Sequence, residues 1–247
     1  MTGLKTPELW CVDLAAAGAA LHTLEERTPR LSAADRARAA DLSDVTVRAE
    51  WVATHIALRL LIERAAGTQC RRATFVRSER GKPHLDGAPL AFSISHAPGL
   101  ALIGLAPGGS IGVDVERTRR VRVGEARRAR IEEAGAALSN EPLPAEGSAR
   151  FLQAWVRLEA VAKADGCGIG RLLTRLGILG VSDEIRAGQA SAGNLVVALL
   201  AGDTPPSVRD LHLGDGVFAA VASIGIVAIG EPAWLPTRVE SLEKLIG

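Results

Sequence analysis

The stretch Phe92–Glu116 reads FSISHAPGLALIGLAPGGSIGVDVE, and it decides the class of fold. It predicts three strands, Ala91–His96, Leu100–Ala106 and Ile111–Glu116, because the turn signals APG and PGGS separate three apolar runs. The third run ends with two carboxylates that are two residues apart, so they share one face of the strand and repel each other. The acidic pair therefore needs an explanation beyond sheet formation.

The sequence around these strands mixes helical and strand patterns. Helices are predicted over 31–42, with Ser32 as N-cap, and over 45–67, with Gly67 as the C-terminal stop. A third helix is predicted over 148–166, and the arginine-rich segment 117–137 is predicted as helix or loop. Short strands are expected over residues 9–15, 72–78, 177–182, 194–200, 208–213 and 216–224, with GDG as a hairpin signal between the last two. The predicted class is α+β.

Composition excludes several classes of protein. The chain has 247 residues, 47% of them hydrophobic, with 29 Lys and Arg against 28 Asp and Glu. A net charge of +1 argues against a dedicated nucleic-acid or membrane-surface protein. The three cysteines have no CxxC spacing, which indicates reduced thiols. Neither a signal peptide nor an apolar run long enough for a bilayer is found, so a soluble, cytoplasmic protein is expected.

The strand IGVDVE places Gly112, Asp114 and Glu116 on one face and three apolar residues on the other. One interpretation is a half-buried strand with a solvated acidic face. The other is a site for a hard cation such as Mg²⁺, which takes carboxylate ligands together with phosphate oxygens and water. Gly112 favours the second interpretation, because it leaves that face open for a ligand or for a close approach of backbone.

The helix over 148–166 supplies another charged pair. Glu159 and Lys163 lie on a flank among apolar neighbours, whereas Gln153 and Arg157 are predicted to mark the solvated side. Glu159 and Lys163 can be read as an ordinary i,i+4 ion pair. Because ion pairs among apolar residues are costly, the pair can equally be functional.

Two further groups are candidates for anion binding. Lys82 lies on the turn GKP, which by itself is typical of a plain surface turn. Ser95 and His96 end a strand and point to opposite faces, so they do not form a nucleophile–base pair, but both can donate hydrogen bonds to an anion.

Taken together and in order, GKP, FSISH, GVDVE and W-x-x-x-E-A-x-x-K-x-x-G-x-G resemble the 4′-phosphopantetheinyl transferase superfamily. Order and spacing are similar to those of its longer, single-chain branch, the surfactin-synthetase-activating type, which modifies carrier domains of peptide and polyketide synthases. The resemblance covers Gly81 to Gly170 most sharply. It implies Mg²⁺-dependent transfer of 4′-phosphopantetheine from coenzyme A to a serine of an apo acyl or peptidyl carrier protein, with release of 3′,5′-ADP.

The resemblance also implies a fold and a set of site residues. Two similar α+β halves, residues 1–107 and 108–247, would be related by a pseudo-twofold, with the active site in the cleft between them and the protein a monomer. The metal ligands would be Asp114, Glu116 and Glu159. Coenzyme A phosphates would contact Lys82, Ser95, His96 and Lys163, and the 3′-phosphate would contact Arg48 or, as a weaker candidate, Arg38. Catalytic roles would fall to Glu159, Lys163 and His96, with Glu159 or a metal-bound water as the base.

One departure from the family pattern keeps alternatives open. The family usually has Lys-Glu-Ala where this chain has Leu158-Glu159-Ala160, and Arg157 cannot replace the lysine because it lies about 100° away around the helix. A non-catalytic relative that binds coenzyme A or a carrier is therefore an alternative, as is another metal-dependent enzyme of phosphate chemistry. A nucleic-acid binder is disfavoured, because the chain has no Tyr and four Phe.

The segment 117–130, RTRRVRVGEARRAR, follows the acidic strand directly and holds seven arginines. Such a run is usually a solvated surface. Its position next to the predicted metal ligands instead favours a basic rim that attracts an acidic carrier domain, with Arg119, Arg120 and Arg122 as its centre.

Overall fold

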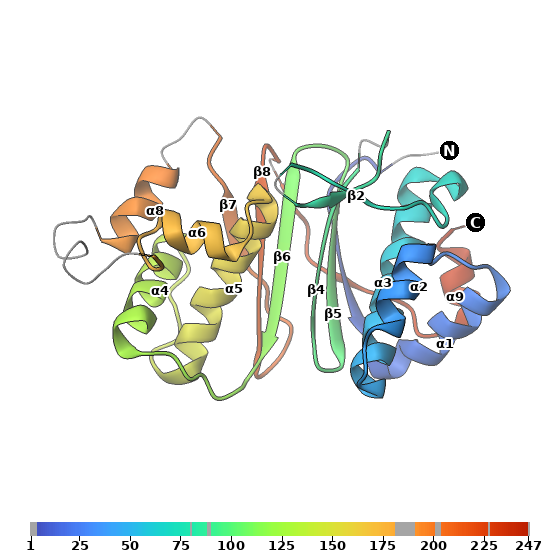
Figure 1. Cartoon of the computed structure of the whole chain (residues 1–247), viewed down its shortest axis with the longest axis horizontal. Helices are drawn as coiled ribbons and strands as arrows, with labels where there is room; N and C mark the ends of the chain where they lie inside the picture. Colours follow the sequence, from blue (N-terminus) through green and yellow to red (C-terminus); the bar gives the residue numbers. More distant parts are fainter. Residues whose placement is uncertain are drawn as a thin grey trace. The chain divides into compact units, whose positions relative to one another are not determined.

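The computed structural model describes residues 4–79, 81–87, 90–180, 191–200, 204–226 and 228–246. Two compact units of mixed helix and sheet make up the chain, coloured along the sequence in Figure 1, which confirms the predicted α+β class. The first unit comprises Met1–Ser78, Pro83–Gly108 and Ala228–Gly247, and the second comprises Glu79–Lys82 and Gly109–Val227. Among the described residues, no helix combines the length and apolar character needed to cross a membrane.

The first unit is built on a sheet with the strand order β4-β5-β1-β9. Its antiparallel part contains β4 (Ala91–Ala97), β5 (Leu100–Ala106) and β1 (Glu8–Asp13), and β9 (Ala233–Trp234) adds in parallel to β1. A separate ribbon pairs β2 (Val76–Arg77) with β3 (Pro83–His84). The predicted strands β4 and β5 are thus confirmed as a hairpin.

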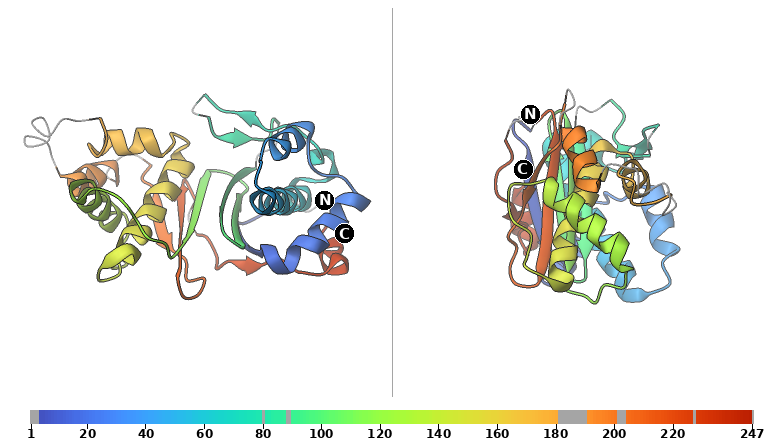
Figure 2. Two further views of the ribbon diagram at one scale, coloured as in Figure 1. Left: turned by 60° about the horizontal axis from the view of Figure 1, so that its bottom comes forward. Right: turned by 90° about the vertical axis from the view of Figure 1, so that its left-hand side faces the viewer.

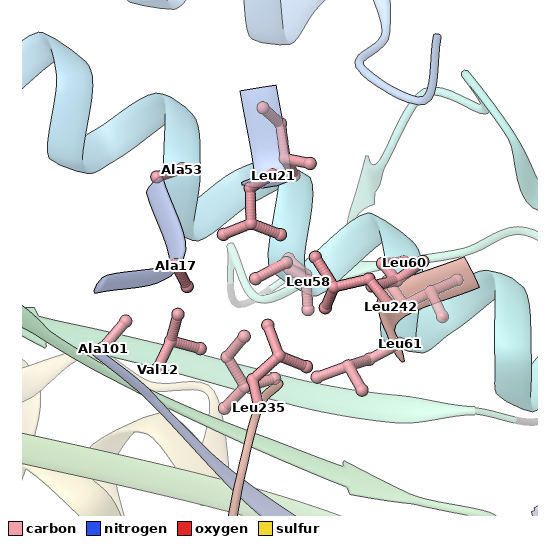
Figure 3. Packing of buried hydrophobic residues seen from close by; sticks show 14 of the residues in the cluster. Val12, Ala17, Leu21, Ala53, Leu58, Leu60, Leu61, Ala101, Leu235 and Leu242 are labelled. Carbon is pink, nitrogen blue, oxygen red and sulfur yellow. The ribbon is translucent and has the colours of Figure 1, made fainter. Parts of the chain in front are cut away.

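The helices α1 (Leu14–Arg27) and α3 (Val45–Ala66) pack on the sheet of the first unit. The helix α2 (Ala33–Ala40) packs on α3, α9 (Val239–Lys244) packs on α1, and a short 3₁₀ turn η1 (Thr68–Cys70) follows α3. The left view of Figure 2 shows α3 nearly end-on against this sheet. Ser32 caps α2 in a capping box, and Gly67 ends α3, both as predicted. Apolar side chains from α1, α3, β1 and the C-terminal segment fill the core in Figure 3.

The second unit has an antiparallel sheet with the order β6-β8-β7. Its strands are β6 (Ser110–Arg117), β8 (Val217–Ile224) and β7 (Ser207–Asp210), and its helices are α4 (Glu125–Ala137), α5 (Gly147–Asp165), α6 (Ile169–Arg175) and α8 (Ala192–Leu200). The helix α5 packs along β6 and β8, and α4 and α6 pack on α5. The third predicted strand is confirmed as β6, and it pairs with β8 of its own unit.

Several predicted strands differ from the structure. The strand expected over 194–200 is wrong, because this segment lies in α8, whose first turn begins where the Ser191 hydroxyl accepts from the Asn194 amide. The strand expected over 9–15 ends at Asp13, whose carboxylate caps a helix that the sequence reading missed. The strand over 72–78 shrinks to two residues. Residues 177–180 are turns, and the rest of that predicted strand lies outside the described residues.

Candidate active site

The glycine of the acidic strand lets α5 approach β6 very closely. A Cβ atom added to Gly112 would lie 2.0 Å from the carbonyl oxygen of Ala160 and 2.4 Å from the amide nitrogen of Ala164. No side chain fits there, so of the two roles predicted for Gly112 the structure supports the close approach of backbone. The face of β6 that carries Asp114 and Glu116 is therefore turned toward α5.

This approach brings together charged side chains that are far apart in the sequence. The ammonium of Lys163 on α5 donates to the Asp114 carboxylate at 2.7 Å and to the Val113 carbonyl at 3.1 Å. Asp114 is buried and Lys163 is half-buried. Glu159, the predicted i,i+4 partner of Lys163, is therefore not its only acidic neighbour, because the lysine also links α5 to β6.

Glu159 belongs to the same group of charges. Burial raises the pKa of the Glu159 carboxyl, the negative charges of Asp114 and Glu116 raise it further, and the positive charge of Lys163 opposes them. Glu116 is paired with the guanidinium of Arg119 at 2.8 Å. The structure thus brings the three predicted metal ligands together with Lys163, one of the predicted phosphate contacts, within the second unit.

The donor set suits a hard cation, because carboxylate oxygens are the ligands that Mg²⁺ takes. Among the residues that the structure describes, no three His, Cys, Asp or Glu side chains are gathered as ready-made metal ligands. In the structure Asp114 pairs with Lys163 and Glu116 pairs with Arg119, so side-chain cations occupy these two carboxylates. Asp114, Glu116 and Glu159 could hold a metal if these two cations turn away.

Lys82 also belongs to the second unit. Its ammonium donates to the Ser110 hydroxyl at 2.8 Å, the Ile111 carbonyl at 2.9 Å and the Ala164 carbonyl at 3.2 Å. Burial lowers the pKa of Lys82 to about 8, and the negative charge of Asp165 opposes this shift. The lysine therefore fastens the start of β6 to the end of α5, which is a structural role that the GKP motif alone did not indicate.

The comparison with known families falls on this part of the chain. Residues 110–221 match the model of the 4′-phosphopantetheinyl transferase superfamily. We call this matched segment the superfamily domain. The superfamily match indicates a transferase, and the domain contains β6, α5 and the four charged residues gathered between them. No curated protein matches the chain.

One prediction about the superfamily domain is wrong. Gln153 and Arg157 do not mark a solvated side of α5, since both are buried, and Arg157 is 0% exposed. The Gln153 side chain donates to the Ala219 carbonyl, and Arg157 pairs with Asp210 at 2.6 Å. Sequence reasoning missed this because the partners of Arg157 lie far along the chain. A signal was present in the apolar residues that flank it on both sides.

Leu158, which replaces the lysine of the family pattern, lies in the core. Its side chain is 0% exposed in the core of the second unit. The position that carries a lysine in the family pattern is therefore part of the packing in this chain.

The other predicted contacts of coenzyme A lie outside the superfamily domain, in the first unit. Ser95 is buried and His96 is exposed, consistent with their places on opposite faces of β4. Arg48, in the first turn of α3, donates to the Leu42 carbonyl at 2.7 Å, whereas Arg38 is exposed in the last turn of α2. Their predicted roles toward coenzyme A stay predictions.

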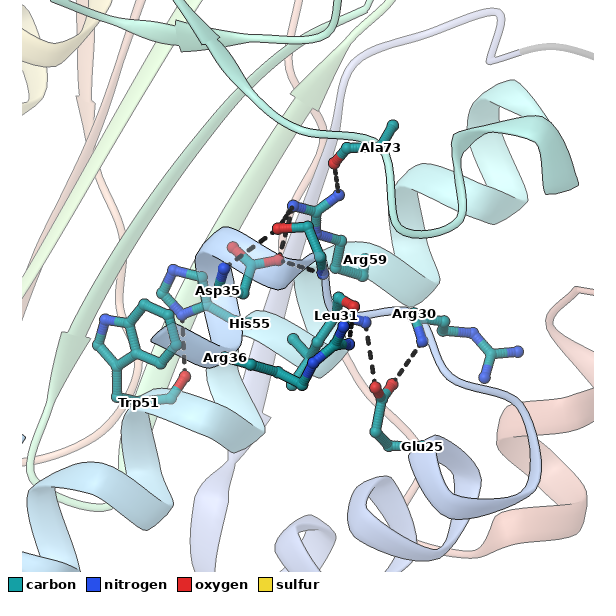
Figure 4. A network of polar contacts seen from close by, with 10 residues as sticks. Glu25, Arg30, Leu31, Asp35, Arg36, Trp51, His55, Arg59 and Ala73 are labelled. Atoms are coloured by element: carbon teal, nitrogen blue, oxygen red, sulfur yellow. Dashed lines mark hydrogen bonds and ion pairs between the residues drawn. The ribbon is translucent and has the colours of Figure 1, made fainter. Parts of the chain in front are cut away.

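The first unit also contains a polar network that sequence reasoning did not single out, drawn in Figure 4. The ring of His55 stacks on Trp51 with ring centres 3.5 Å apart, and its Nδ1 lies 2.9 Å from the Trp51 carbonyl oxygen. Burial lowers the pKa of His55 to about 4 and is the largest cause, followed by the Trp51 bond and Asp35, which raise it, and Arg59 and His96, which lower it. His55 is therefore neutral at pH 7.

Proposed function

We propose that this protein transfers 4′-phosphopantetheine from coenzyme A to a serine of an apo acyl or peptidyl carrier protein, as a cytoplasmic, Mg²⁺-dependent enzyme. One observation carries the proposal. Within the superfamily domain, β6 and α5 bring Asp114 and Lys163 into contact and place Glu159 in the field of Asp114 and Glu116. A cluster of carboxylates that can hold a divalent cation, next to a lysine, suits the chemistry of a pyrophosphate.

In this proposal Asp114, Glu116 and Glu159 hold the Mg²⁺. The ion would supply positive charge to the phosphoryl oxygens of coenzyme A and to the departing 3′,5′-ADP. The residues fit this role in their chemistry, because all three are carboxylates. They also fit in charge: Glu159 lies in the field of Asp114 and Glu116, whose charges are partly neutralised by Lys163 and Arg119 and would be neutralised by a bound cation.

Cationic side chains would bind the donor. Lys163 has a half-buried side chain whose ammonium can exchange the Asp114 carboxylate for a phosphate oxygen. We propose the same anion-binding role for Lys82, Ser95, His96 and Arg48, with Arg48 at the 3′-phosphate. For Lys82 this requires the ammonium to give up at least one of its present acceptors.

The group transfer itself is a displacement at phosphorus. The carrier serine oxygen forms a bond to the phosphorus of the phosphopantetheine moiety, and the bond from that phosphorus to the oxygen of 3′,5′-ADP breaks, with the electron pair leaving on the ADP. The serine proton passes to the Glu159 carboxylate.

The alternative, a relative that binds coenzyme A or a carrier without transfer, was suggested by Leu158. The side chain of Leu158 is completely buried, so the residue at this position contributes to the core of the domain and not to the charged cluster. Loss of the family lysine therefore need not remove a group from the charged cluster. If no carrier protein is modified when it is incubated with this protein, coenzyme A and Mg²⁺, the conclusion is a protein that binds without transfer.

The metal assignment is tested with variants that keep shape and remove charge. Asp114→Asn retains an oxygen acceptor for Lys163, and we expect it to stay folded and to lose transfer in Mg²⁺. Glu132→Gln is the matched control, because Glu132 has ion pairs with Arg128 and Arg150 in the same domain. Near-normal turnover of Asp114→Asn, measured at saturating coenzyme A and carrier, would rule out the assignment.

A further inference from the structure

The helix α5 is held by close backbone contacts and by polar side chains. Toward β6 and α4, small residues allow backbone to touch backbone: Gly112 meets α5 at Ala160 and Ala164, and a Cβ atom on Gly135 would lie 2.5 Å from Ala154. Contacts between small apolar groups fix how closely two elements approach. They are not directional, so the rotation of α5 depends on its polar contacts. Toward β6 these are the bonds of Lys163 to Asp114 and Val113, and those of Lys82 and Ser110 to the Ala164 carbonyl.

On the side opposite Glu159, Arg157 makes four directional bonds. Arg157 forms a bidentate salt bridge with Asp210 of β7: its Nε lies 2.7 Å from one carboxylate oxygen and its Nη2 lies 2.6 Å from the other. Its Nη1 donates to the Gly135 carbonyl at 3.0 Å and its Nη2 to the Glu141 carbonyl at 2.9 Å. The planar guanidinium thus ties α5 to β7, to α4 and to the loop before α5.

We propose that Arg157, through its pair with Asp210, is a positioning residue for the transfer reaction: it fixes the rotation and the height of α5, and so the place where Glu159 and Lys163 meet Asp114. This inference rests on the proposed function. Arg157 touches neither substrate nor reacting atoms.

The geometry of the helix explains why one arginine can matter at a distance. Two residues correspond to 200° around a helix, so Arg157 and Glu159 project from nearly opposite sides of α5. Side chains end about 5–6 Å from the helix axis, so a rotation of about 10° moves a side-chain tip by about 1 Å. A misplacement of that size is enough to cost about 100-fold in rate.

When a buried ion pair is replaced by apolar residues of similar volume, the protein often stays equally stable. A planar arginine in a bidentate salt bridge, in contrast, specifies the orientation of the element that carries it. The pair therefore gives a test in which folding and positioning can be separated.

The test is the double variant Arg157→Met with Asp210→Leu, which removes both buried charges together. We expect a folded protein by circular dichroism, a KM for coenzyme A within about twofold of the parent, and a kcat lower by about 10- to 100-fold. The matched control is Arg30→Met with Glu63→Leu, a buried pair at 2.7 Å in the first unit, which should leave kcat unchanged. A folded Arg157/Asp210 double variant with the parental kcat would overturn the proposal.

Arg157→Lys provides a second variant should the double variant fail to fold. A lysine keeps the charge next to Asp210 but loses the planar fork, so we expect a folded protein with reduced kcat. Full kcat in this variant would also overturn the proposal.

A readout independent of activity separates this inference from the proposed function. The ¹⁵N NMR signal of the Lys163 ammonium reports its contact with Asp114, and we expect its chemical shift to change in both Arg157 variants. If the parent transfers nothing to any carrier, the proposed function fails, and the Lys163 signal still decides on positioning. An unchanged Lys163 signal in folded variants would contradict it.

Discussion

The substitution Gly112→Ala tests whether the approach of α5 to β6 builds the charged cluster. The added methyl carbon would lie 2.0 Å from the Ala160 carbonyl oxygen, 2.4 Å from the Ala164 amide nitrogen and 3.0 Å from the Lys163 carbonyl carbon. All three are backbone atoms of α5, so no side chain can rotate out of the way. The strand and the helix must move apart.

The size of the effect follows from these distances. Ordinary van der Waals contact begins at 3.4 Å, so the approach to Ala160 is too short by about 1.4 Å. Overpacking of this kind costs about 1–3 kcal/mol of folding free energy, and contact with backbone places Gly112→Ala at the upper end. Because Asp114 on β6 and Lys163 on α5 move apart with their elements, we also expect kcat to fall by about 100-fold.

Both quantities can be measured on one preparation, the free energy of unfolding by urea denaturation and kcat by carrier modification at saturating substrates. Gly170→Ala is the matched control, because Gly170 lies in α6 with nothing within 4 Å of an added Cβ atom. The control should be neutral or slightly stabilising. The reasoning is refuted if Gly112→Ala matches the parent in both stability and kcat.

Two other predictions use charge. Because His55 has a pKa of about 4 in the folded protein and about 6.5 when unfolded, the unfolded state binds its proton first, and the free energy of unfolding should drop by about 2–3 kcal/mol between pH 6.5 and pH 4. His55→Phe should remove this part of the drop in denaturation curves recorded across that range; parallel pH profiles for parent and variant would contradict the expectation. Reversing the exposed Arg120 and Arg122 to Glu should raise the KM for an acidic carrier several-fold and flatten its dependence on salt, with the KM for coenzyme A unchanged. Arg119 is left in place because it pairs with Glu116, and an unaltered carrier KM with unaltered salt dependence would mean that the carrier docks elsewhere.

Much of the local structure could be predicted from the sequence. Alternation placed Asp114 and Glu116 on one face of β6, and capping residues such as Ser32 and Gly67 marked helix ends to within a residue or two. These signals work because they depend on neighbours in the chain. The same holds for Glu159 and Lys163, whose spacing on α5 already set them on one flank.

The features that escaped prediction depend on contacts between distant segments. The burial of Arg157 follows from Asp210, which lies 53 positions further along the chain, and helical periodicity alone made the arginine look solvated. The acceptors of Lys82 on β6 and α5 were hidden for the same reason. In α8, a short apolar run fitted both helix and strand, and its packing against α4 decided for helix.

The central claim is that this protein transfers 4′-phosphopantetheine, and intact mass spectrometry of a carrier tests it most directly. Apo acyl and peptidyl carrier proteins are incubated with the protein, coenzyme A and Mg²⁺, beside a known 4′-phosphopantetheinyl transferase as positive control. The account predicts that at least one carrier gains the mass of a single 4′-phosphopantetheine group, that 3′,5′-ADP appears in equal amount, and that a carrier with its acceptor serine changed to alanine stays unmodified. Carriers that the positive control modifies but that keep their apo mass with this protein would contradict the claim.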